Sequence, residues 1–143
     1  LAAVLGMGAD GVLIGTRVLV AEEVWSHLEV KKQIVNSGAS DSTLVMSSFR
    51  NTSRVINNEF ARAVQSLESD GIEDFDQYWP YVKGANAFDA YKSGDWNKAL
   101  LSMGQSAVFA DSVQPMEKIY DTLIDEAAVA LERLRGLRPS KMV

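Results

Sequence analysis

The chain has 143 residues, of which 47% are hydrophobic and 23% charged, which is enough for one compact core and excludes a disordered tail. Its net charge of −5 comes from intermixed acidic and basic residues, which argues against a nucleic-acid or membrane-surface partner, and no apolar run approaches the ~20 residues of a membrane span. The absence of cysteine excludes disulfides and thiolate metal sites and favours a cytoplasmic location.

The first residues are typical of the end of an apolar helix followed by a short buried strand. Residues 1–7 are mostly apolar, and Gly6 and Gly8 are expected to end the helix. Residues 11–15 form a continuously apolar run bounded by glycines, as in strands buried on both faces of a parallel sheet. Because one strand cannot form a sheet, we expect the chain to be the C-terminal fragment of a larger α/β protein.

The middle of the chain predicts mainly helices. Residues 26–29 match a capping box, so a helix is expected from about His27 to Asn36 with Ser26 as its N-cap. Residues 43–47 have some strand character, whereas the apolar spacing over residues 52–69 predicts a helix.

The last third is also expected to be helical. Short helices and turns are predicted over residues 71–94, after which Asp95 is expected to cap another helix. Pro115 is expected at the first position of a long final helix. The apolar stripe of that helix consists of Ile119, Leu123, Ala127, Leu131 and Leu134.

Two glycine motifs could bind a phosphate group. Residues 6–11 match G-x-G-x-x-G, but a dinucleotide site needs a strand before the glycines and a helix after them, and here the predicted order is reversed. Gly15 and Thr16 stand where a strand is expected to end and a helix to begin, so free backbone N–H groups favour an anion there. A plain helix cap explains Gly15 and Thr16 equally well.

Other polar candidates are weaker. His27 is the only histidine, and its place at a predicted helix start favours a surface residue over a general base. Acidic pairs such as Glu22 and Glu23 lack histidine partners at ligand spacing, so no metal site is expected. Residues 102–106, Ser-Met-Gly-Gln-Ser, interrupt apolar helical stretches and either contact a ligand or join two helices.

Several segments together resemble the nitronate monooxygenases, formerly called 2-nitropropane dioxygenases. They are residues 9–17 (Ala-Asp-Gly-Val-Leu-Ile-Gly-Thr-Arg), 21–23, 31–35, 41–43, 48–52 with 54–55, 104–107 and 115–119. Flavin-dependent enoyl-acyl-carrier-protein reductases share the pattern around Gly15. The order of all these segments is more specific than any one of them.

This resemblance implies an α/β fold, namely the C-terminal fragment of an FMN-binding TIM (β/α)8 barrel with a mainly helical inserted cap domain. Residues 1–24 would be the last barrel unit, residues 25–103 the helical cap, and residues 104–143 a pocket segment and a helix returning to the barrel. The residues implied to bind the cofactor are Leu13, Ile14, Gly15, Thr16 and Gln105. Those implied to face the substrate pocket are Ser102 and Gly104.

The implied activity is the oxidation of alkyl nitronates with dioxygen, with FMN as cofactor. The family's catalytic histidine would lie before residue 1, and His27 does not match it, so no catalytic residue is assigned in this chain. The implied partners are a small-molecule substrate and the upstream part of the same barrel, and a homodimer stays open. The alternatives are an enoyl-acyl-carrier-protein reductase, another phosphate-binding barrel, and a non-catalytic helical binding module.

Overall fold

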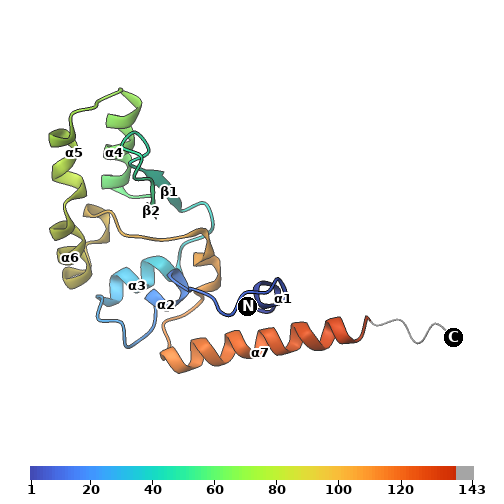
Figure 1. Ribbon diagram of the computed structural model, residues 1–143. Coiled ribbons are helices and arrows are strands. Elements are labelled where there is room, and N and C mark those ends of the chain that lie inside the picture. Colours follow the sequence, from blue (N-terminus) through green and yellow to red (C-terminus); the bar gives the residue numbers. More distant parts are fainter. Residues whose placement is uncertain (138–143) are drawn as a thin grey trace.

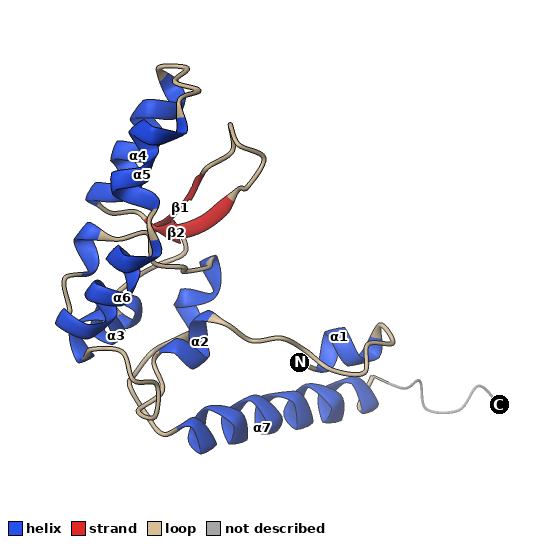
Figure 2. Cartoon of the chain, turned by 60° about the vertical axis from the view of Figure 1, so that its left-hand side comes forward, coloured by secondary structure: helices blue, strands red, loops and turns tan. Residues whose placement is uncertain are grey.

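The computed structural model describes residues 1–137, and most of them are helical (Figures 1 and 2). Residues 138–143, which end the predicted third part of the chain, lie outside the described residues. The α-helices are α1 (Ala2–Gly6), α2 (Thr16–Leu19), α3 (Leu28–Val35), α4 (Glu59–Ser69), α5 (Phe75–Val82), α6 (Gly84–Ser93) and α7 (Met116–Arg135). The remaining elements are the strands β1 (Ser42–Val45) and β2 (Ser53–Ile56) and the 3-10 helices η1 (Trp96–Lys98) and η2 (Gln105–Phe109).

The prediction of a strand over residues 11–15 was wrong for this chain, because these residues form an extended loop between α1 and α2. A buried parallel strand needs neighbouring strands on both sides, and within residues 1–137 none pairs with this segment. Leu13 is consequently fully exposed, at 105% of its reference area. Residues 1–137 therefore provide no sheet in which the apolar residues 11–15 could be buried.

A small sheet forms instead in the middle of the chain. β1 pairs with β2 in antiparallel fashion, with Ser42 opposite Ile56. The strand character expected at residues 43–47 is confirmed, but the predicted helix over residues 52–69 begins only at Glu59. The β-branched Val55 and Ile56 favour a strand, and Asn58 then caps α4 by accepting a hydrogen bond from the backbone N–H of Ala61.

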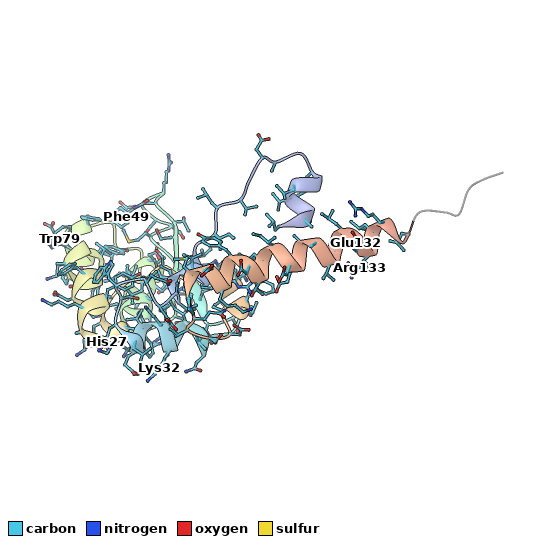
Figure 3. The ribbon with its side chains drawn as sticks, turned by 90° about the horizontal axis from the view of Figure 1, so that it is seen from below. His27, Lys32, Phe49, Trp79, Glu132 and Arg133 are labelled. Carbon is cyan, nitrogen blue, oxygen red and sulfur yellow. The ribbon has the colours of Figure 1, made fainter. Side chains whose placement is uncertain are left out.

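Two predicted helix starts are displaced by one residue, and a third predicted helix is only a short 3-10 helix. α3 is confirmed, but its N-cap is His27, whose Nδ1 accepts from the backbone N–H of Glu29, while Ser26 is buried. Asp95 precedes only the short η1 and makes no side-chain cap bond, and Pro115 is the N-cap of α7 rather than its first residue. His27 is exposed as expected, and Figure 3 places it at the edge of the molecule.

Two apolar clusters form the core. One consists of Val20, Val30, Ile34, Ile56, Ala90, Ala99, Leu101, Met103, Ala107 and Ala110. The other joins the hairpin to α4 and α5 and consists of Val45, Met46, Val55, Ala61, Val64 and Tyr78. The first cluster crosses both predicted part boundaries, at residues 24–25 and 103–104, and the division of the chain into three parts stays a prediction.

The last helix, α7, packs against α1 and α2, as expected from its apolar stripe. Figures 1 and 2 show α7 running beneath the other elements with α1 beside its far half. Ile119 is fully buried near its start, whereas Leu131 and Leu134 are about half exposed near its end. Glu132 and Arg133 lie on this projecting end (Figure 3). Within residues 1–137, no helix is both long enough and apolar enough to cross a membrane.

Candidate functional site

The turn from Ile14 to Arg17 has the features of an anion-binding turn. The carbonyl of Gly15 accepts from the backbone N–H groups of Val18 and Leu19, which starts α2. The N–H groups of Thr16 and Arg17 have no acceptor within residues 1–137. A Cβ placed on Gly15 would meet no atom within 4 Å, so open space lies beside the backbone here. Free N–H groups next to open space fit a phosphate group such as that of FMN.

Thr16 connects this turn to the second predicted segment. The backbone N–H of Gly104 donates to the Thr16 hydroxyl at 2.9 Å, although the two residues are 88 positions apart. Thr16 is only 7% exposed, so this bond is largely shielded from water. Because the hydroxyl oxygen accepts from Gly104, its own proton stays available for donation to an anion. The fold thus brings together two residues that the sequence assigned to cofactor and substrate separately.

The segment around Gly104 is fixed by the small sheet. The backbone N–H of Ile56 donates to the carbonyl of Leu101 at 2.9 Å, and that of Met103 donates to Arg54 at 3.3 Å. Ser102 faces Val55 in an isolated antiparallel bridge. Residues 101–103 therefore run along the free edge of β2, and this position brings Gly104 into contact with Thr16 of the turn. The segment after Gly104, η2, then packs on α2.

The other predicted site residues are more dispersed. Gln105 begins η2 and is exposed, and Ser102 is exposed at the sheet edge. Ile14 is half-buried and lines a pocket, whereas Leu13 lines a neighbouring apolar groove against α7. The structure therefore joins Thr16 to Gly104 directly and leaves Leu13 apart from them.

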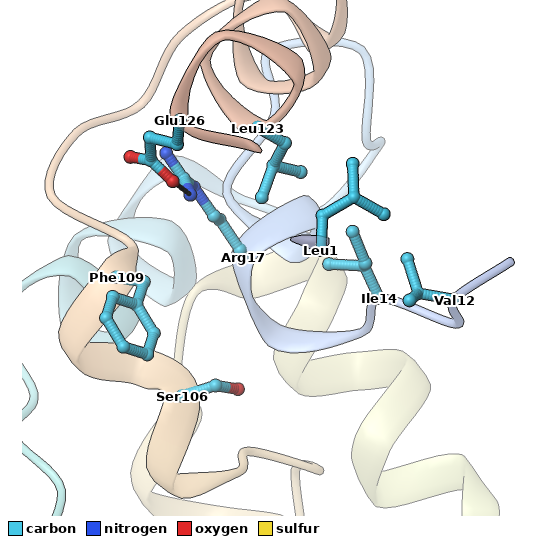
Figure 4. Close-up of a pocket in the computed structure, with 8 residues that line it drawn as sticks. All are labelled: Leu1, Val12, Ile14, Arg17, Ser106, Phe109, Leu123 and Glu126. Atoms are coloured by element: carbon cyan, nitrogen blue, oxygen red, sulfur yellow. Dashed lines mark ion pairs between the residues drawn. The ribbon is translucent and has the colours of Figure 1, made fainter. Parts of the chain in front are cut away.

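A pocket of about 280 Å³ lies beside the turn, between residues 12–17, η2 and α7 (Figure 4). It is lined by Leu1, Val12, Ile14, Arg17, Ser106, Phe109, Leu123 and Glu126. Of these eight residues, the sequence had assigned Ile14 to the cofactor site and had placed Ser106 in a segment that could contact a ligand. Arg17 could have been found, because it directly follows Gly15 and Thr16, but Glu126 is placed here only by tertiary packing.

Arg17 is the most unusual side chain of this pocket. It is only 9% exposed, and its Nε atom is buried without a hydrogen-bond partner within residues 1–137. Its Nη1 lies 3.6 Å from a carboxylate oxygen of Glu126, whose side chain is 62% exposed (Figure 4). An exposed carboxylate at this distance neutralises a buried guanidinium only in part. The pocket wall next to the turn therefore holds one buried cation, Arg17, and one exposed carboxylate, Glu126.

The start of α7 is held against the residues that follow α2. Both carboxylate oxygens of Glu23 accept from the backbone N–H of Met116, at 3.1 and 2.8 Å. The backbone N–H of Glu22 donates to Gln114, and the buried Lys31 ammonium donates to the carbonyls of Ala21 and Glu22. These contacts fix the position of α7, and so of Glu126, relative to the turn.

Within residues 1–137, two groups have a shifted pKa, and both lie outside this pocket. A hydrogen bond and charge from Lys32 lower the pKa of the Glu29 carboxyl, and burial raises the pKa of the Tyr91 phenol. Within residues 1–137, no group of three or more histidine, cysteine or acidic side chains could hold a metal ion.

Comparison with known proteins identifies the family. Residues 1–126 match the family described as nitronate monooxygenase. The chain belongs to this family. It is also similar to the structure of FabK from Thermotoga maritima, with a TM-score of 0.84 and 28% identity over 94% of this chain and 42% of that chain. The structure of its M276A mutant matches with a TM-score of 0.74 and 27% identity, over 94% and 40% of the two chains.

These findings confirm the resemblance and the α/β fold class expected from the sequence. The chain spans about two-fifths of the length of the FabK chain, and its described residues are mostly helical. Membership of the nitronate monooxygenase family supports a flavin as the cofactor.

Proposed function

We propose that this chain supplies the flavin-phosphate side of an FMN-dependent oxidoreductase that oxidises alkyl nitronates with dioxygen. The observation that carries the proposal is the hydrogen bond from Gly104 to Thr16, because it joins the phosphate turn to the predicted pocket segment. Membership of the nitronate monooxygenase family supports the flavin chemistry. Bound FMN would supply the redox step, taking electrons from the nitronate and passing them to dioxygen.

In this proposal the protein residues bind and orient. The N–H groups of Thr16 and Arg17 and the Thr16 hydroxyl hold the phosphate beside Gly15, with Leu13, Ile14 and Gln105 close to the cofactor. Ser102 and Gly104 face the substrate. The base that removes a proton from the substrate is expected in another part of the barrel, since His27 serves as the cap of α3. The apolar residues 11–15 would pair with strands of that same barrel.

The second candidate is reduction of an enoyl thioester with a nicotinamide electron donor. It is favoured by the similarity to FabK, which extends over nearly the whole of this chain. Both activities use the same phosphate site, so the geometry of Gly15 and Thr16 supports them equally. They differ in the electron donor and in the acceptor.

Flavin binding is the first test. The natural gene product that contains residues 1–143 should purify with FMN, read from its visible absorbance. Gly15→Val should lower FMN occupancy by roughly tenfold or more, because a β-branched side chain fills the space beside the free N–H groups. Lys92→Ala, at an exposed position of α6, should leave the occupancy unchanged. Unchanged occupancy in Gly15→Val would contradict the phosphate assignment.

Thr16 gives a sharper version of the same test. Thr16→Val keeps the shape of the side chain but removes the hydroxyl that accepts from Gly104, and it should weaken FMN binding by roughly tenfold. Thr16→Ser keeps the hydroxyl and should bind FMN within about threefold of the parent. Equal losses in the two variants would show that packing, and not the hydroxyl, determines affinity.

Activity separates the two candidates. Oxygen consumption with propane 2-nitronate, without a nicotinamide donor, is expected for the first. Oxidation of NADH or NADPH that depends on an enoyl thioester would instead support the second. A protein that binds FMN and shows only the thioester-dependent reaction would overturn the nitronate proposal while leaving the phosphate site intact.

A further inference from the structure

Arg17 presents a problem that the binding turn alone does not explain. An arginine that is only 9% exposed is normally paired and hydrogen-bonded through its guanidinium, because an uncompensated buried charge is costly. Here Nε has no partner within residues 1–137, and the one facing carboxylate, on Glu126, is 3.6 Å away and mostly exposed. The cation therefore retains much of its positive potential inside the fold.

That potential lies next to the phosphate turn. Arg17 directly follows Thr16, whose N–H has no acceptor within residues 1–137 and whose hydroxyl accepts from Gly104, and it lines the pocket together with Ile14 and Ser106. Figure 4 shows the guanidinium rising from α2 toward Glu126 on α7. In such a shielded place the effective dielectric is far below that of water, so the charge acts over several ångströms.

We propose that Arg17 is an electrostatic positioning residue, a buried cation behind the phosphate turn that strengthens its affinity for a phosphate dianion. The inference rests on the proposed FMN site and deepens it, because it assigns a source of selectivity for the phosphorylated flavin over the unphosphorylated one. Glu126 acts in the opposite direction, since its carboxylate partly offsets the charge of Arg17. The pair therefore sets the strength of the anion site.

The test compares FMN with riboflavin, which has the same ring system and side chain but lacks the phosphate. Dissociation constants for both flavins are measured by fluorescence quenching on the apoprotein of the natural gene product, and the quantity of interest is their ratio. Arg17→Gln keeps a polar side chain of similar length without the charge. It should weaken FMN roughly tenfold and riboflavin little, so the preference for FMN falls roughly tenfold. Arg17→Lys keeps the charge and should retain the preference within about threefold.

Glu126→Gln tests the other member of the ion pair, and its effect should be opposite to that of Arg17→Gln. Glu126 is 62% exposed, so its replacement should not disturb folding, and losing the carboxylate should raise the FMN preference about twofold to threefold. This variant also keeps the test decisive if Arg17→Gln fails to fold. A preference that is unchanged or lower in Glu126→Gln overturns the proposal.

Two further outcomes count against the inference. Equal weakening of FMN and riboflavin in Arg17→Gln would mean that Arg17 merely holds α2 in place. Loss of the FMN preference in Arg17→Lys to the same degree as in Arg17→Gln would mean that charge is not the cause. If the parent protein binds neither flavin, the proposed function itself fails; if it binds FMN but the ratio does not respond, only the role of Arg17 fails.

Discussion

Replacing Asn58 by alanine tests how the site segment is held in place. The Asn58 side chain is 1% exposed and makes three hydrogen bonds. Its Oδ1 accepts from the backbone N–H of Ala61 at 3.0 Å, which caps α4, and its Nδ2 donates to the carbonyls of Trp96 and Ala99, each at 2.7 Å. Losing the cap costs about 1 kcal/mol, and leaving the buried Ala99 carbonyl without a donor costs about 1–3 kcal/mol more. The expected loss of unfolding free energy is about 3 kcal/mol.

The neighbouring Asn57 provides a matched control. It is exposed, and within residues 1–137 only its backbone groups form hydrogen bonds, so Asn57→Ala should change the stability by less than about 0.5 kcal/mol. Urea unfolding of both variants of the natural gene product, followed by circular dichroism, gives the two free energies. A loss below about 1 kcal/mol for Asn58→Ala, or one equal to that of Asn57→Ala, would refute this account of the buried amide.

Two more predictions concern residues around α3 and α6. Gly94 has φ 89°, and a Cβ there would lie 2.5 Å from Nδ1 of His27. Gly94→Ala should therefore lower the free energy of unfolding in urea by about 2 kcal/mol. As a control, Gly84→Ala places a Cβ with no atom within 4 Å and should change this free energy by under about 0.5 kcal/mol. Equal effects would contradict the predicted clash. Burial raises the pKa of Tyr91 above its ordinary 10.0, so the stability this phenol contributes is fully present below the unfolded pKa and is lost as pH rises through the folded pKa. Tyr91→Phe should abolish that part of the stability loss at pH values above the unfolded pKa of 10.0, and a variant that loses stability as steeply as the parent would exclude Tyr91 as its source.

Local patterns in the sequence predicted several elements well. The capping pattern before Leu28 placed α3 within a residue, and the apolar stripe led by Ile119 predicted α7. Both helices carry their determinants within their own segment, as a cap and a periodic face. The resemblance to a known family then supplied the fold class, which periodicity alone could not give.

The failures occurred where a partner distant in sequence determines the structure. Val55 and Ile56 fit a helical spacing, but pairing with β1 on one side and with residues 101–103 on the other makes them a strand. Residues 11–15 have the composition of a buried strand, yet pairing partners are missing within residues 1–137, so they form a loop. Strand formation depends on neighbours that no local pattern reveals.

The candidate site shows the same division. The free N–H groups of Thr16 and Arg17 could be expected from the sequence, because a helix start was predicted after Gly15, and their role as an anion turn stays a prediction. The contact of Thr16 with Gly104 was not, because the two residues are separated by the hairpin and four α-helices. Neither was the pairing of Arg17 with Glu126, which depends on how Glu23 and Gln114 anchor the start of α7.

The connection from Asn58 to the turn links the folding of the middle of the chain to the proposed phosphate site. Asn58 holds the carbonyl of Ala99, the following residues pair with β2, and Gly104 then donates to Thr16. If FMN binds only when Thr16 is in contact with Gly104, it must stabilise the contacts from Asn58 to Thr16. A ligand that binds the folded state and not the unfolded state raises the free energy of unfolding. At a hundred times its dissociation constant, FMN should then add about 2.7 kcal/mol, close to what Asn58→Ala removes. FMN should therefore restore most of the stability of that variant, and riboflavin at the same concentration should restore less. If FMN and riboflavin raised the free energy of unfolding of Asn58→Ala equally, the phosphate turn would not be the part of the site that connects Asn58 to the cofactor.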